Sequence, residues 1–282
     1  MGENGHPASV RAKLKNKAQS QGKEFNLVLT RFALERFLYR LSISEYRDQF
    51  VLKGALLFDL WFDFPLRATR DIDLLGFQTP DKTYLIKVFR TLCLMKLMDG
   101  IEFDQSTLQT DEIRKVANYS GLRVSLFSFL DGARSLVQVD VGFGDVITPE
   151  AELVDYPVLL NEFPSPQLRA YPRYSVIAEK LDALINLGMA NSRMKDYFDL
   201  WVILKESKLE KEILKKAVNS TCKRRQTPMP VGLPTGLTKD FFKDKNKINQ
   251  WDIFLIKNQL AHIELSHMVK DLQEKLSFLF LN

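Results

Sequence analysis

The sequence is poor in the residues that bind zinc or form disulfide bonds. It contains two cysteines, Cys93 and Cys222, and three histidines, His6, His262 and His267. The cysteines lie far apart along the chain, and neither belongs to a metal-ligand spacing. The composition therefore argues against a zinc enzyme and against a disulfide framework, and it favours a reduced, cytoplasmic protein.

Long apolar runs are absent as well. No stretch of about 18 uncharged apolar residues occurs, so we expect no membrane-spanning helix. The N-terminus, MGENGHPASVRAKLKNKAQ, lacks the apolar stretch of a secretory signal. A Gly-x-Ser-x-Gly motif is also missing, so nothing indicates serine hydrolase chemistry.

The charge of the chain is mildly basic and unevenly distributed. The formal net charge is +5 and the pI is about 9.0. Residues 205–225 contain eight lysines and arginines against three glutamates. Two interpretations of this basic segment stay open, a solvated helix face and a surface that contacts nucleic acid.

The order of the predicted elements indicates an α+β protein. Helices come first, a mixed sheet region follows, and the C-terminal half is helical. Helices are expected over residues 9–21, 26–42, 55–62, 81–98, 174–188, 194–218 and 250–279, and strands over 50–52, 72–75, 107–116, 122–130 and 135–143.

The connections between these elements carry recognisable turn and breaker residues. Gly121 and the Asp131-Gly132 pair supply turns between the predicted strands. The proline-rich segment from Pro149 to Pro172 is expected to be an extended connector, and Gln226 to Thr238 is rich in turn residues. We divide the chain into N-terminal helices at 1–45, a core at 46–172 and a helical region at 173–282.

Two aspartates one residue apart are the first candidates for chemistry. Asp71 and Asp73 flank Ile72 in a predicted strand, so their carboxylates share one face while Ile72 points to the core. Neighbouring carboxylates repel each other, and a shared cation relieves that repulsion. Oxygen ligands of this kind suit Mg²⁺, which binds through one or two carboxylates and substrate phosphates. An exposed acidic strand end is the structural alternative.

Two further positions give this pair a context. Gly54 lies between a predicted strand and a predicted helix, where exposed N–H groups can hold phosphate, although a simple turn is the alternative. In Val137 to Phe143 the valines alternate with polar residues, which places Asp140 on the polar face of its strand. Asp140 is either a third carboxylate of a phosphoryl-transfer site or a solvent-facing residue.

The C-terminal half contributes a lysine and two acids. Lys180 is surrounded by Val176, Ile177, Ala183 and Leu184 on its predicted helix, so it must reach solvent, pair with an acid or serve a site. Asp196 and Asp199 share a helix face. Either acid can be a helix N-terminal charge, a partner of Lys180 or a base for an attacking hydroxyl.

Taken in order, these motifs resemble the AbiEii/AbiGii family of nucleotidyltransferase toxins, found in abortive-infection and toxin–antitoxin systems. The resemblance spans about residues 9–205 and includes the helix with Arg36-Phe37-Leu38-Tyr39-Arg40-Leu41. It implies a polymerase-β-like nucleotidyltransferase fold with a mixed sheet, flanking helices and a C-terminal region that completes the active site. The matching motifs are Phe50-Val51-Leu52-Lys53-Gly54-Ala55, Arg67-Ala68-Thr69-Arg70-Asp71-Ile72-Asp73-Leu74, Ala178-Glu179-Lys180-Leu181 and Lys195-Asp196-Tyr197-Phe198-Asp199-Leu200.

The resemblance also implies roles for individual residues. Asp71 and Asp73 would hold Mg²⁺, and Asp140 resembles the third carboxylate of the wider superfamily. Ala55 replaces the usual second Gly or Ser, which leaves any phosphate contact there to its backbone N–H. The residues implied to meet the nucleotide are Lys53, Gly54, Ala55, Thr69 and Lys180, with Lys180 at the triphosphate and Asp196 as the last catalytic acid.

The expected function follows from the resemblance. It implies a Mg²⁺-dependent toxin that moves a nucleoside monophosphate from an NTP to an RNA acceptor, tRNA, under the control of a cognate antitoxin protein. One alternative keeps the fold but transfers phosphate to a protein such as the antitoxin. Another is a nucleotide- or RNA-binding module with structural acids, whose ligand binding would not need Mg²⁺.

Overall fold

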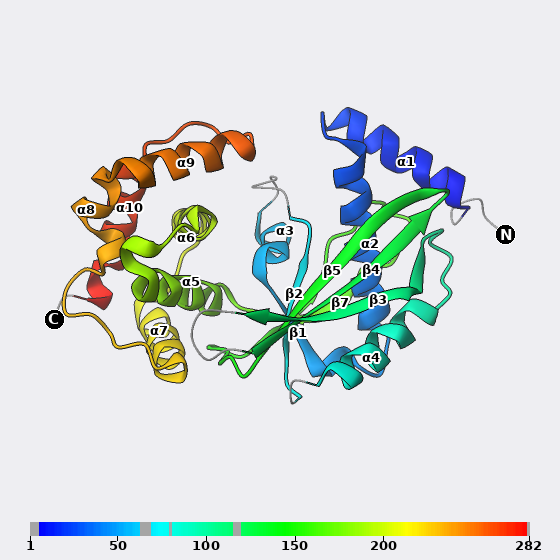
Figure 1. Ribbon diagram of the computed structural model, residues 1–282, viewed down its shortest axis with the longest axis horizontal. Helices are drawn as coiled ribbons and strands as arrows, with labels where there is room; N and C mark the ends of the chain where they lie inside the picture. The colour runs from blue at the N-terminus through cyan, green and yellow to red at the C-terminus, as the bar shows by residue number, and fades with distance from the viewer. Residues whose placement is uncertain (1–5, 63–68, 79–80, 115–119, 281–282) are drawn as a thin grey trace. The chain divides into compact units, whose positions relative to one another are not determined.

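The computed structural model describes residues 6–62, 69–78, 81–114 and 120–280 (Figure 1). The chain forms two compact units. Unit 1 comprises Met1–Gly144 and Glu152–Ala170, and unit 2 comprises Asp145–Ala151 and Tyr171–Asn282. The short segment Asp145–Ala151 therefore leaves the sheet-bearing unit and contributes to the helical one.

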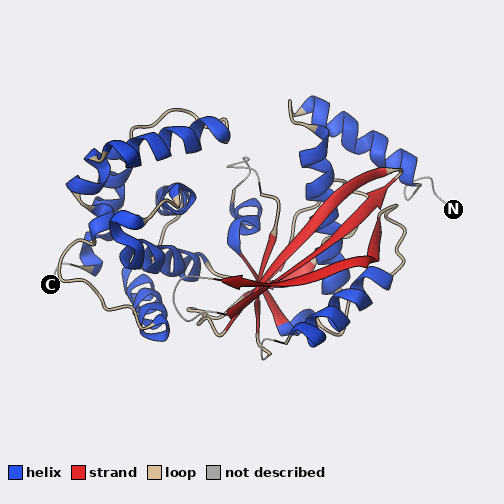
Figure 2. Cartoon of the chain, in the orientation of Figure 1, coloured by secondary structure: helices blue, strands red, loops and turns tan. Residues whose placement is uncertain are grey.

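Unit 1 is built on a mixed β-sheet (Figure 2). The sheet forms because apolar and polar residues alternate along its strands, as in β5, where Val137, Val139 and Val141 are fully buried. The described strands are β1 (Phe50–Lys53), β2 (Ile72–Gly76), β3 (Glu102–Arg114), β4 (Ser120–Leu130), β5 (Ala133–Phe143), β6 (Glu152–Asp155) and β7 (Gln167–Ala170).

The strand order is β3-β4-β5-β2-β1-β7-β6. β2 pairs in parallel with β5, and β1 pairs in parallel with β7. The pairs β1–β2, β3–β4, β4–β5 and β6–β7 are antiparallel. β1 and β2 thus lie in the middle of the described sheet, where neighbours on both sides fix their positions.

Helices cover one face of the β3–β4–β5 part of the sheet. α2 (Phe25–Ser42) contacts β5 and β7, α1 (Pro7–Ser20) contacts β4, and α4 (Lys82–Leu94) contacts β3 and β4. Asp81 caps α4 by accepting a hydrogen bond from the Thr83 N–H at 2.9 Å. Between β1 and β2 lie the 3-10 turn η3 (Gly54–Leu57) and the short helix α3 (Phe58–Trp61), and η2 (Arg47–Gln49) precedes β1.

Unit 2 is helical, with α5 (Arg173–Leu187) packed against both α6 (Met194–Glu206) and α7 (Lys211–Arg225). The remaining helices pack through aromatic and aliphatic side chains; the Tyr197 and Phe241 rings, for example, stack at 4.9 Å between centroids. These helices are α8 (Lys239–Lys243), α9 (Lys245–Lys257) and α10 (Leu265–Leu276), with short 3-10 turns η4 (Gly188–Ala190), η5 (Thr235–Leu237) and η6 (Ser277–Leu279). Within the described residues, no helix combines the length and apolar character needed to cross a membrane.

The turn predictions are confirmed at one position and wrong at another. Asp131 and Gly132 connect β4 to β5 with φ of 47° and 77°, as a two-residue hairpin turn requires. Gly121, predicted as a turn, instead lies inside β4 opposite Gly142. The residues that link β3 to β4, 115–119, lie outside the described residues, as does the end of the predicted strand 107–116.

The predicted helix 194–218 is wrong, because the chain is extended between α6 and α7. Ser207 ends α6 and the backbone N–H of Glu210 donates to the Tyr174 hydroxyl at 3.1 Å, not to a helical carbonyl. Buried residues on the two helices, such as Leu200 and Leu214, keep nearly the same helical phase. Periodicity therefore could not reveal the break.

Three other predicted boundaries were also wrong. The helix 250–279 is two helices, because Gln259 adopts a φ of 55° that ends the α9 segment. The helix 81–98 stops at Leu94, since Arg40 binds the Met95 carbonyl and the Asp99 carboxylate and draws that segment around its guanidinium. The predicted connector from Pro149 to Pro172 contains β6 and β7.

Candidate active site

Four charged side chains form one row across the sheet of unit 1. Strand pairing places Lys53 opposite Asp73, Asp73 beside Asp140, and Asp140 opposite Arg123. Paired residues project from the same face, about 5 Å apart. The row across β1, β2, β5 and β4 therefore has two carboxylates between two cations.

Asp71 and Asp73 lie at the start of β2 on either side of Ile72. Ile72 is fully buried, and both aspartates are partly exposed. The prediction that Ile72 faces the core is confirmed. The alternation of the strand turns both carboxylates away from that core, toward the face that carries the row of charges.

Gly54 lies directly against the side chain of Asp73. It follows β1 and begins η3, and its φ is +76°. A Cβ atom on Gly54 would lie 2.6 Å from the Asp73 Cγ. The positive φ and this close approach both require glycine, so the residue serves as more than a turn: it makes room for the Asp73 carboxylate.

Arg123 is a member of the site that sequence reasoning missed. Its guanidinium binds both oxygens of Asp140 at 2.8 Å. This hydrogen bonding, together with the charges of Asp140, Asp71 and Asp73, raises the pKa of Arg123. All three carboxylates therefore act on one cation, which follows from the pairing of β4 with β5 and could not be read from either strand alone.

The chemistry of these residues fits a divalent cation bound by two carboxylates. Asp71 and Asp73 supply oxygen ligands, and Mg²⁺ in such sites takes its other ligands from water and substrate phosphates. Among the described residues no group of three or more acidic, histidine or cysteine side chains is arranged to hold a metal. Asp140 gives both oxygens to Arg123, so its predicted metal role stays a prediction that would require this ion pair to rearrange.

The other residues predicted to meet the nucleotide lie close by in the chain. Lys53 is buried at the end of β1, and Ala55 is half-buried in η3. Thr69 is buried just before Asp71. Arg67 and Ala68, which belong to the same sequence motif, lie outside the described residues.

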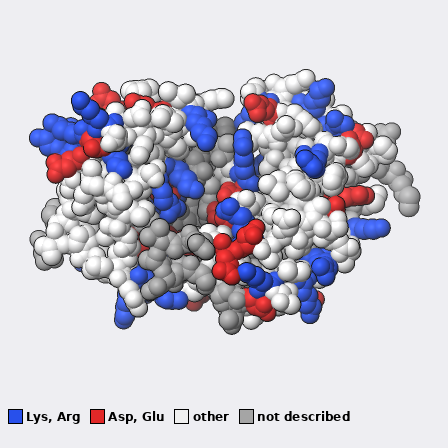
Figure 3. All heavy atoms as spheres, in the orientation of Figure 1, with Lys and Arg blue, Asp and Glu red and all other residues white. Residues whose placement is uncertain are grey.

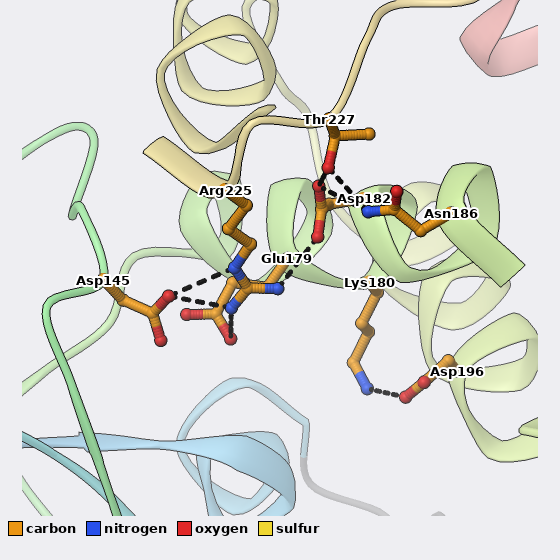
Figure 4. Close-up of polar contacts among 8 residues, drawn as sticks. All are labelled: Asp145, Glu179, Lys180, Asp182, Asn186, Asp196, Arg225 and Thr227. Atoms are coloured by element: carbon orange, nitrogen blue, oxygen red, sulfur yellow. Dashed lines mark hydrogen bonds and ion pairs between the residues drawn. The ribbon is translucent and has the colours of Figure 1, made fainter. Parts of the chain in front are cut away.

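In unit 2, Lys180 pairs with both acids that the sequence offered as partners. Its Nζ lies 2.8 Å from Asp196 Oδ1 (Figure 4). The same Nζ lies 2.7 Å from Asp199 Oδ2. Arg193 binds Asp196 as well, at 2.8 Å. The Lys180 side chain is 13% exposed, and those of Asp196 and Asp199 are 2% and 1% exposed. The ion pairs with these two carboxylates therefore compensate for the burial of the lysine among apolar residues.

A second ionic cluster of unit 2 surrounds Arg225 (Figure 4). Its guanidinium lies 2.9 Å from Asp145, 3.2 Å from Glu179 and 3.1 Å from Asp182. Burial opposes the charged form, but the charges of Glu179, Asp145 and Asp182 prevail and raise the pKa of Arg225. The cluster joins α5, the end of α7 and the segment Asp145–Ala151.

The basic residues of the segment 205–225 are of two kinds, one in the Arg225 cluster and the others exposed to solvent. Arg225 is held among acids, while the other seven basic residues of the segment are exposed. In the view of Figure 3, Lys and Arg are interspersed with Asp and Glu among the coloured residues, without a large area of one sign. The exposed residues are Lys205, Lys208, Lys211, Lys215, Lys216, Lys223 and Arg224.

The fold is similar to that of two crystal structures from Helicobacter pylori. This chain superposes on the crystal structure of JHP933 from Helicobacter pylori with a TM-score of 0.50 and 14% sequence identity, covering 87% of this chain and 88% of that one. A second crystal structure, titled "putative nucleotidyltransferase from H. pylori", gives the same TM-score and identity and covers 87% of this chain and 90% of that one. At this identity the likeness shows the fold: an α+β protein with a mixed sheet and flanking helices.

The family is shown by the sequence. Residues 36–276 match the family described as nucleotidyl transferase AbiEii toxin, type IV toxin–antitoxin system. The chain belongs to this family and is a nucleotidyltransferase. A search of the curated proteins found no match.

Proposed function

We propose that this enzyme transfers a nucleoside monophosphate from an NTP to a hydroxyl group of an RNA acceptor, tRNA, and that Asp71 and Asp73 hold the Mg²⁺ that this reaction uses. The observation that carries the proposal is the juxtaposition of Asp73 and Gly54. The Asp73 carboxylate, which is of the kind that binds Mg²⁺, lies against Gly54 at the turn that follows β1. Backbone N–H groups at such a turn can bind phosphate.

In the proposed reaction the acceptor oxygen attacks the α-phosphorus of the NTP, a new phosphodiester bond forms, and pyrophosphate leaves. A bound Mg²⁺ would neutralise charge on the phosphate oxygens. Lys53, Thr69 and the N–H groups of Gly54 and Ala55 position the nucleotide on unit 1. From the family resemblance alone, we propose that Lys180 contacts the triphosphate and that Asp196 is the last catalytic acid.

Lys180 needs a change of partner for this role. It is held between Asp196 and Asp199, and a phosphate that binds its Nζ must compete with both carboxylates. These two contacts hold the Lys180 side chain in one orientation before the nucleotide binds. Asp199, which sequence reasoning left open, is then as strong a candidate as Asp196 for controlling Lys180.

The membership of a type IV toxin–antitoxin family implies an antitoxin partner and a nucleotide substrate. We propose that the enzyme works in the cytoplasm, where NTPs and tRNA are both available.

A label-transfer experiment tests the proposal. The protein is incubated with Mg²⁺, total tRNA and each NTP in turn, labelled either at the α- or at the γ-phosphate. The proposal predicts that α-label joins RNA and that Asp73→Asn abolishes this, while Asp240→Asn, at an exposed position on α8, does not. Transfer of γ-label to a co-expressed protein would instead favour a phosphotransferase. Transfer to RNA that survives the combined Asp71→Asn and Asp73→Asn changes would contradict the proposal.

A further inference from the structure

One face of the β4–β5 hairpin is open. Along β4 the residues Leu122, Val124 and Leu126 are buried, while those between them are partly exposed. β5 repeats the pattern with Val137 and Val139 buried. Among the described residues of unit 1, the helices α1, α2 and α4 pack on the buried face, and the residues of the opposite face are partly or fully exposed.

Four cross-strand pairs make up that open face. They begin at the hairpin end with Phe129 opposite Arg134, continue with Phe127 opposite Leu136 and Ser125 opposite Gln138, and finish with Arg123 opposite Asp140. The last pair belongs to the row of charges at the candidate active site. The open face is therefore continuous, in register, with that site.

The hairpin end of this face is aromatic and cationic. Phe129 is 37% exposed and Leu136 is 46% exposed, so these two residues together present apolar surface to the solvent. The Arg134 guanidinium lies over the Phe127 ring, 4.5 Å from its centroid. A flat aromatic surface with a cation on it is the arrangement that stacks unpaired bases while meeting their phosphates.

The spacing suits a short single strand. Phe127 is four residues from Arg123, about 13 Å along β4, which corresponds to about four stacked nucleotides. Exposed single-stranded bases on a sheet with aromatic side chains are a common mode of RNA recognition.

We propose that this open face, defined by Phe127, Phe129, Arg134 and Leu136, binds the unpaired end of the nucleic acid acceptor and directs it along β4 and β5 to the row at Asp73 and Asp140. The inference deepens the proposed function and rests on it for the identity of the acceptor. It assigns the bases of the acceptor to the aromatic rings and its phosphates to Arg134 and Arg123.

Charge favours a nucleic acid path over β4 and β5. Between the aromatic end and the active-site row lie the uncharged Ser125 and Gln138. The neighbouring strand β3 presents Glu102 opposite Phe129 and Asp111 opposite Arg123, and both are exposed. These acids repel a phosphate backbone, so they form a boundary that confines the strand to the hairpin.

A binding measurement tests the inference without requiring turnover. The probe is a fluorescein-labelled 12-nucleotide single-stranded RNA, and its anisotropy is followed with the full-length protein in the absence of NTP. Phe129→Leu keeps an apolar side chain but removes the aromatic ring, and Phe129→Trp keeps stacking. Leu94→Ala, at another exposed apolar position, is the control.

The expected result is that Phe129→Leu and Arg134→Gln each weaken binding by about tenfold, the loss that one stacked base produces, while Phe129→Trp and Leu94→Ala leave it unchanged. The same RNA in a duplex should bind more weakly. Unchanged binding in both Phe129→Leu and Arg134→Gln would overturn the inference, even if label transfer to RNA persists. Loss of antitoxin binding in these variants, with RNA binding intact, would reassign the face to a protein partner. Conversely, RNA bound on this face without any nucleotide transfer would contradict the proposed function alone.

Discussion

Two clusters of this protein each combine an arginine with three acids, yet they are built differently. In unit 2, Arg225 makes an ion pair with each of Asp145, Glu179 and Asp182, and its side chain is 19% exposed. In the described part of unit 1, Arg123 forms an ion pair with Asp140, while Asp71 and Asp73 act on it through their charge; its side chain is 41% exposed.

The difference teaches what each cluster can do. A buried arginine whose acids all bind it is a structural crosslink, because no ligand can approach without breaking ion pairs. Around Arg123, the three carboxylates carry a formal charge of −3 against +2 from Arg123 and Lys53, and this net negative charge attracts a metal ion. Substitutions in one cluster should therefore change stability, and substitutions in the other should change catalysis.

The largest expected effect is that of Asp73→Ala on transfer. Removing a metal-holding carboxylate should lower the rate by about 10³-fold or more, the scale of losing a principal electrostatic contribution to the transition state. The melting temperature should change little, because Asp73 is partly exposed. Thermal unfolding and initial rates of label transfer measure the two effects. Full activity in Asp73→Ala would contradict the assignment of this cluster to catalysis.

Arg225→Met should have the largest effect on stability. The substitution leaves three acids without their shared cation, which costs about 3 kcal/mol in buried ion pairs. The nearby Lys223→Met, at an exposed position, should change the free energy of unfolding by less than about 0.5 kcal/mol. Urea denaturation measures both. Equal stability of the two variants would show that the Arg225 cluster is not a crosslink.

Gly54→Ala should lower both the stability and the transfer activity, because the new Cβ strains the backbone and displaces the Asp73 carboxylate. Gly22→Ala is the matched control: Gly22 has a φ of +61°, but a Cβ there meets nothing within 4 Å. Both variants should lose about 1 kcal/mol of stability from the positive φ. Only Gly54→Ala should also lose transfer activity, by about tenfold, measured per folded molecule. If both variants keep full activity, the close approach of Gly54 to Asp73 has no catalytic importance.

The smallest expected effect concerns the Mg²⁺ requirement. Arg123→Gln removes a positive charge beside Asp71 and Asp73, so the concentration of Mg²⁺ needed for half-maximal transfer should fall, by about fivefold for a surface interaction of about 1 kcal/mol. Arg123→Lys should retain the wild-type requirement. Arg11→Gln, which breaks an exposed ion pair with Asp131, is the control. A higher Mg²⁺ requirement in Arg123→Gln would show that Arg123 supports the cation site.

The sequence predicted those features that depend on local alternation. Residue spacing within one or two elements predicted that Ile72 faces the core and that Asp140 lies on the polar face of its strand. It also offered a nearby acid as a partner of Lys180. Arg123 and Arg225 could not be predicted, because their partners come from other strands and segments and only tertiary pairing brings them together. The break after Glu206 was missed because the apolar period continues across it.

The central claim is that Asp71 and Asp73 form a metal-dependent nucleotide site, and equilibrium binding of the four labelled NTPs tests it most directly. Each NTP is dialysed against the wild-type protein and Asp73→Asn, with Mg²⁺ or with EDTA. The account predicts that at least one NTP binds the wild-type protein with Mg²⁺, and that either EDTA or Asp73→Asn weakens this binding by tenfold or more. NTP binding that stays as tight in EDTA, and as tight in Asp73→Asn, as it is for the wild-type protein with Mg²⁺ would contradict it.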